Sequence, residues 1–184
     1  MASWFKTRKA AQVAAFFARK EGGKINLLKL VKLIYLANRR AMDKYDYPLF
    51  DDYLVSMKHG PVNSTVYNLI NGVEEDREDW EEFVTSRQNY DIGLRRKTVT
   101  NKDLDELSNA DLAVLLKTWD QFGKKTEWEL VRYTHKYCPE WEDPGETAWS
   151  IPYARIFTAL GKKHGDRLQK MIEERRQIES AFPG

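Results

Sequence analysis

The sequence has little of several features that whole classes of protein require. Its 184 residues contain a single cysteine, Cys138, and three histidines. One cysteine cannot form an intramolecular disulfide, which favours a reducing compartment. No apolar run approaches the ~18 residues of a membrane-spanning helix, and the basic start of the chain lacks the cleavage site of a signal peptide. We therefore expect a cytoplasmic protein that has no membrane partner.

Charge is close to balanced, with 30 basic and 28 acidic side chains and a net charge of +2. Such a small excess does not by itself indicate a nucleic-acid partner. The signs are segregated, however, into an acidic stretch at 74–82 and basic stretches at 95–97 and 162–176. We expect each stretch to be a solvated surface, with a binding patch as the alternative. With 42% hydrophobic and 12% aromatic residues, the composition is that of a folded chain.

Motifs for phosphate binding and for catalysis are missing, since neither GxGxxG nor GxxxxGKS/T occurs. His135 and Cys138 are spaced i, i+3, but they supply two ligands where a structural zinc site needs four. A nucleophilic Cys138 with His135 as its base is the sharpest enzyme hypothesis. The alternative that we favour is a small buried thiol at a helix end. His59, next to Gly-Pro, is expected to be a turn residue and not a general base. The sequence therefore predicts no catalytic site, no metal and no cofactor.

The apolar spacing predicts a mainly α protein, a single-domain helical bundle with a small two-stranded β-ribbon. The longest helix, capped by Asn26, has a wide apolar arc and is expected to lie at the centre. Two short strands, at 53–57 and 90–99, are expected to pair with each other, because an isolated strand cannot satisfy its backbone groups. Residues 59–61 are expected to turn the chain. The stretch 74–88 is expected to be a loop or a frayed helix. Other helices are predicted near 7–20, 64–71, 109–122 and 127–137, from Pro152 in a first turn through Leu160, and after Gly165 through Ile178.

The helices at 109–122 and 127–137 have the lengths and the short link of a helix-turn-helix. Ser108 and Thr126 are predicted as their N-caps, each with a carboxylate three residues on. Acidic residues, Glu127 and Glu129, stand where base-reading side chains would lie, and they would oppose phosphates. We therefore interpret this pair as an ordinary helical hairpin, which disfavours a nucleic-acid partner.

Four ordered motifs resemble those of the Panacea domain family, which includes SocA-like antitoxins and phage-associated proteins. They are LKLVKLIY at 28–35, YPLFDD at 47–52, MKHGPV at 57–62 followed by Val66-Tyr67, and LVRYTH at 130–135 followed by Trp141. Met57 stands where the family usually has an aromatic residue. The resemblance assigns a fold-defining role to Leu33, Tyr35, Lys58, Gly60, Pro61, Val62, Tyr67, Thr134 and His135.

The resemblance also implies an organisation and a function. It covers about residues 7 to 160, so we expect a Panacea-like helical domain at 1–160 and a C-terminal helical appendage at 161–184. It implies an antitoxin that binds and neutralises a protein toxin encoded nearby, with a protease system as a further partner if it acts as an adaptor. The alternative is a phage or prophage regulatory module that binds nucleic acid or a host protein.

Two surfaces compete as the docking site for that partner. One lies on the central helix, where an apolar residue falls among charges, and consists of Lys29, Lys32, Leu36 and Arg40. The other is the stripe of the last helix, Leu168, Met171, Ile172 and Ile178, which would be exposed if that helix detached from the domain. The alternative for the second stripe is simple packing onto the bundle.

Overall fold

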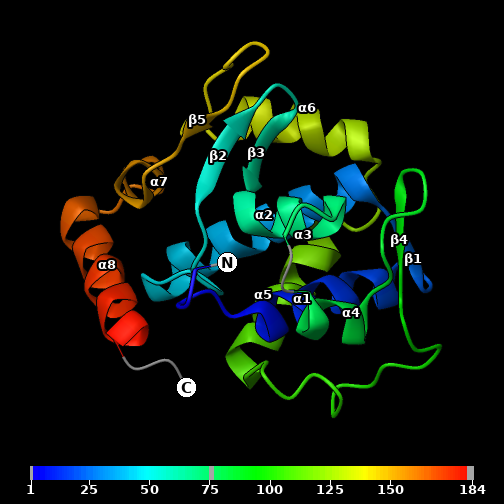
Figure 1. Ribbon diagram of the computed structural model, residues 1–184. Helices are drawn as coiled ribbons and strands as arrows, with labels where there is room; N and C mark the ends of the chain where they lie inside the picture. The colour runs from blue at the N-terminus through cyan, green and yellow to red at the C-terminus, as the bar shows by residue number, and fades with distance from the viewer. Residues whose placement is uncertain (1, 75–76, 182–184) are drawn as a thin grey trace.

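The computed structural model describes residues 2–74 and 77–181 and is mainly α-helical (Figure 1). Its centre is α2 (Leu27–Tyr45), which contacts α1 (Thr7–Lys20), α5 (Asn109–Phe122) and α6 (Glu127–Tyr137). The predicted cap is confirmed, because the Asn26 side chain accepts hydrogen bonds from the backbone N–H groups of Leu28 and Lys29. Every residue from 29 to 38 is buried, so this part of α2 is enclosed on all sides and not on one face alone, whereas its last turn is exposed.

The remaining helices lie close to their predicted positions, and most of them pack against α2. Both predicted capping boxes are present, Ser108 with Asp111 and Thr126 with Glu129. A short helix, α4 (Glu78–Phe83), occupies part of the acidic stretch, of which residues 75–76 lie outside the described chain. The others are α1 (Thr7–Lys20), α3 (Ser64–Asn71), α5 (Asn109–Phe122), α6 (Glu127–Tyr137), α7 (Tyr153–Ala159) and α8 (Gly165–Ala181).

The strands form two small antiparallel sheets, so the predicted pairing of 53–57 with 90–99 is wrong. β2 (Leu54–Met57) turns through Lys58-His59 and pairs with β3 (Gly60–Asn63), while β5 (Trp149–Ser150) adds to its other edge. β4 (Asp91–Gly93) pairs instead with β1 (Lys24–Asn26). A two-residue turn closes a hairpin at little entropic cost, so β2 takes the neighbouring segment as its partner. Pro61 is tolerated because β3 is an edge strand.

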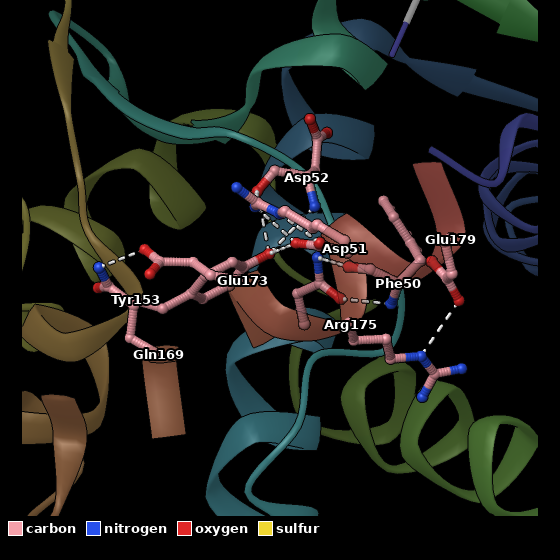
Figure 2. A network of polar contacts seen from close by, with 10 residues as sticks. Phe50, Asp51, Asp52, Tyr153, Gln169, Glu173, Arg175 and Glu179 are labelled. Carbon is pink, nitrogen blue, oxygen red and sulfur yellow. Dashed lines mark hydrogen bonds and ion pairs between the residues drawn. The ribbon is translucent and has the colours of Figure 1, made fainter. Parts of the chain in front are cut away.

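A polar network attaches α8 to the rest of the molecule (Figure 2). Arg176 donates to both carboxylate oxygens of Asp51, with Nη2 at 2.7 Å from Oδ1. The Tyr153 hydroxyl of α7 donates to the same Asp51 oxygen and accepts from the backbone N–H of Asp52. The Arg176 guanidinium also lies 4.3 Å from the centre of the Trp4 ring. Helix α8 is therefore docked on α7 and on the segment before β2, at the edge of the molecule far from β1 and β4 (Figure 1).

Within the described residues, no helix is both long enough and apolar enough to cross a lipid bilayer.

Candidate functional site

The β2–β3 hairpin packs its turn directly onto α2 and α6. Gly60 has a φ of +96°, and a Cβ at this position would lie 2.7 Å from Oγ1 of Thr134 and 3.1 Å from Nζ of Lys32. The Pro61 carbonyl accepts a hydrogen bond from Nζ of Lys32 at 2.8 Å. Only a glycine permits both this backbone conformation and this close approach. Residues from three separate segments of the chain therefore meet at one point.

The segment after α6 holds the hairpin from another direction. The indole N–H of Trp141 donates to the Met57 carbonyl at 2.9 Å, and His135 stacks on Trp141 with ring centres 3.8 Å apart. The hydroxyl of Tyr35 donates to Glu140, which is almost fully buried, at 2.7 Å. Leu33 and Val62 belong to the surrounding core. These contacts make the hairpin a rigid platform.

Above this platform lies an open pocket of about 570 Å³, which we call the motif groove. It has apolar walls from α2, the hairpin and α3, and it is bounded by the loop before β4 and by the first turn of α6. Its lining residues are Asn26, Leu27, Leu28, Val31, Lys32, Met57, Lys58, His59, Gly60, Val62, Tyr67, Arg87, Tyr90, Glu127 and Trp128.

Two large aromatic side chains stand exposed at the rim of the motif groove. Trp128 is 49% exposed and meets His59 edge to face, with ring centres 5.3 Å apart. Tyr90 is 69% exposed, and the Arg87 guanidinium lies 5.5 Å from its ring centre. Tryptophan, tyrosine and arginine are the residues most enriched in binding hot spots. Trp128 was not predicted as a contact residue, because its spacing on α6 is that of a packing residue.

A family model described as antitoxin SocA-like, Panacea domain, matches residues 30–142. The chain belongs to the Panacea family. Comparison with curated proteins and with solved structures gives no match. The matched Panacea region contains all the lining of the motif groove except Asn26, Leu27 and Leu28, whereas α8 lies outside it. Most of the groove therefore lies within the matched region of this chain, and α8 does not contribute to it.

The four residues of the first contact surface predicted for this Panacea protein do not form an exposed patch, and their contact with a partner stays a prediction. Its side chains are Lys29, Lys32 and Leu36, which are 7%, 1% and 5% exposed, and Arg40, which is half-buried. Nζ of Lys29 pairs with Glu21 and donates to the Gly123 carbonyl at 2.8 Å. Because neighbouring elements cover α2 over residues 29–38, the amines of Lys29 and Lys32 bind internal carbonyl acceptors and not solvent.

The second predicted surface, on α8, is divided between the core and solvent. Ile172 is fully buried against the bundle, and Leu168 is partly buried. Met171 and Ile178 are 54% and 62% exposed, although the helix is docked and not detached. The division of the chain into a domain at 1–160 and an appendage at 161–184 stays a prediction.

The chemistry of Cys138 does not favour a nucleophile. The thiol is 1% exposed, and burial raises its pKa from 9.0 to about 12, which keeps it protonated at neutral pH. His135 is occupied by its stack on Trp141, and desolvation lowers the pKa of its imidazole. Across residues 2–74 and 77–181, the structure has no group of three or more His, Cys, Asp or Glu side chains arranged to hold a metal ion. The residues of this site are therefore suited to binding another molecule.

Lys32 is an unusual component of the groove, because burial lowers the pKa of its ammonium from 10.5 to about 7. The unfolded chain holds this proton up to about pH 10.5, whereas the folded chain releases it near pH 7. The Lys32 contribution to stability is therefore least favourable below pH 7 and becomes more favourable as the pH rises towards 10.5.

Replacing Lys32 with methionine removes this titration while keeping a long apolar stem. We expect the free energy of unfolding, variant minus wild type, to be more positive at pH 6.5 than at pH 9 by roughly 2 kcal/mol. Urea denaturation at the two pH values measures the difference. A difference that does not change with pH would show that the amine titrates normally in the folded protein.

Proposed function

We propose that this Panacea protein is an antitoxin that acts in the cytoplasm, has no enzymatic activity, and neutralises a protein toxin by direct binding through the motif groove. The observation that carries the proposal is the position of the groove. Residues of the Panacea motifs, Lys58, Gly60, Val62 and Tyr67, line it together with the exposed Trp128. The family match supports an antitoxin-like role, and the groove supplies a surface for it.

The composition of the groove supports protein binding. Its walls are mostly aliphatic, from Leu27, Leu28, Val31 and Val62, and its rim is aromatic and charged. An apolar centre surrounded by polar side chains is the usual arrangement of a protein–protein contact. Exposed tryptophan on a rigid helix loses little conformational entropy on binding, which makes Trp128 a suitable anchor.

Truncation of Trp128 tests the proposal directly. The protein is co-expressed with the toxin candidate encoded by the neighbouring reading frame, and survival and co-purification are measured. We expect Trp128→Ala to weaken toxin binding by about tenfold or more, or about 1.4 kcal/mol, and to reduce protection. Its melting temperature should stay near that of the wild type, because half of the side chain is already in solvent.

The matched control is Trp149→Ala, since Trp149 is 50% exposed but does not line the groove. We expect this variant to protect cells as well as the wild type does. Equal loss of binding in both variants would point to a general effect of surface aromatics, and full protection by Trp128→Ala would remove the groove from the proposal. A wild-type protein that neither binds nor neutralises its neighbour would refute the antitoxin assignment.

An adaptor role rests on a separate surface, since an adaptor must hold a toxin and a protease at the same time. We propose the exposed side of α8, with Met171 and Ile178, for the second contact. Replacing both with serine leaves the buried Ile172 and the Arg176–Asp51 pair in place. We expect the double variant to bind the toxin normally but to lengthen the toxin's half-life in pulse-chase experiments. An unchanged half-life in this variant would argue against α8 as a protease contact.

A further inference from the structure

The cations around the motif groove differ in whether a carboxylate already neutralises them. Lys58 forms an ion pair with Glu146, and the amine of Lys32 is turned to the Pro61 carbonyl. Arg87 has no carboxylate partner in the described part of the chain. Its guanidinium donates to the Asn71 side chain at 2.6 Å and to the carbonyl of Asn89. Hydrogen bonds therefore hold the Arg87 guanidinium in place at the rim, but no carboxylate of the described residues neutralises its charge.

The geometry around Arg87 fixes this charge in place. The Asn71 amide oxygen comes from the last residue of α3, so the bond ties the loop before β4 to a helix. The guanidinium also lies over the Tyr90 ring, 5.5 Å from its centre. An arginine that is already ordered by such contacts loses less entropy when it pairs with a ligand.

The remaining lining limits what can pair with Arg87. Leu28, Val31 and the ring of Tyr67 line the same groove as Arg87, so an occupant must offer an apolar group as well as an anion. The acidic residue among the groove lining, Glu127, precedes Trp128 in the chain and repels a second anion there. A volume of about 570 Å³ holds a few side chains and not a folded domain.

We propose that the motif groove binds a short segment of the toxin in which a large apolar side chain stands next to a carboxylate. The apolar side chain enters between Leu28, Val31 and Tyr67, and the carboxylate pairs with Arg87. This inference rests on the proposed antitoxin function and adds the chemistry of the bound segment. An anion combined with aromatic stacking also describes single-stranded nucleic acid, but the aliphatic walls and Glu127 favour a peptide.

The experiment uses the full-length protein and a displayed library of random 12-residue peptides. Peptides are selected on the wild type, and binding of the selected sequences is measured by fluorescence anisotropy. We expect enrichment of Asp or Glu beside Phe, Trp, Leu or Ile. We expect Arg87→Glu to weaken binding by about tenfold or more, and a peptide whose acidic residue is changed to lysine to regain affinity for this variant.

Arg167→Glu is the matched control, because Arg167 is an exposed arginine of α8 outside the groove. It makes the same charge change and should leave binding within about twofold of the wild type, if the effect is local to the groove. Arg87→Gln serves where Arg87→Glu fails to fold, since glutamine can still donate to Asn71.

Three results would overturn the inference. One is a selected consensus without acidic residues, and another is unchanged affinity for Arg87→Glu. The third is a 12-nucleotide single-stranded DNA that binds as tightly as the selected peptides and loses affinity in Arg87→Glu. The peptide selection uses no toxin, so its failure would contradict the groove chemistry without contradicting the antitoxin assignment, which the Trp128 experiment tests. If the neighbouring toxin does not bind, the antitoxin assignment is contradicted, and the peptide selection still tests the chemistry of the groove.

Discussion

Gly60→Ala is expected to lower the free energy of unfolding by about 2–4 kcal/mol. Two costs combine at this position. The backbone has a φ of +96°, and the new Cβ would lie 2.7 Å from Oγ1 of Thr134 and 3.1 Å from Nζ of Lys32. Both neighbours are buried, so neither can move aside into solvent.

Gly22→Ala separates the two costs. Gly22 also has a φ of +96°, but a Cβ there would meet nothing within 4 Å. We expect this control to lose only about 1 kcal/mol, the cost of the backbone conformation alone. Urea denaturation followed by circular dichroism measures both variants. Equal losses at the two positions would mean that the hairpin is not tightly packed on α2 and α6.

Arg176→Met is expected to cost about 2–4 kcal/mol of unfolding free energy, because it leaves the carboxylate of Asp51 without its partner. The Asp51 side chain is only 7% exposed, and that of Arg176 is 18% exposed. The Tyr153 hydroxyl still donates to Asp51 in the variant, but one hydrogen bond does not neutralise a buried charge. The loss should appear as weaker docking of α8.

The neighbouring Arg175 provides the control for this change. It pairs with Glu179 within the same helix at 3.1 Å, and its side chain is 58% exposed. We expect Arg175→Met to change the free energy of unfolding by no more than about 0.5 kcal/mol. Hydrogen exchange resolved over α8 distinguishes local release from global unfolding. Similar values for the two variants would show that the Asp51 pair contributes no more than a surface pair.

Little of the motif groove could be predicted from the sequence. No motif or spacing in the sequence marks Trp128 or Arg87 as a contact residue. Each residue is ordinary in its own segment. Trp128 and Arg87 become part of one binding site because five parts of the chain surround the same cavity: α2, the hairpin, α3, the loop before β4 and the start of α6. The family motifs at 57–62 and 130–135 marked the platform under the groove, since their residues pack on each other.

What the sequence determined by itself is local. The helices and their caps at Asn26, Ser108 and Thr126 follow from contacts between residues at most four positions apart, which periodicity and side-chain chemistry specify. Only the tertiary structure decided which strands pair, that Lys29 and Lys32 are buried, and that Arg176 reaches Asp51 across 125 residues. Those outcomes depend on which elements cover a given face. A helix of suitable amphipathicity does not specify its neighbours, so the same lysine is a surface charge or an internal tether according to what packs against it.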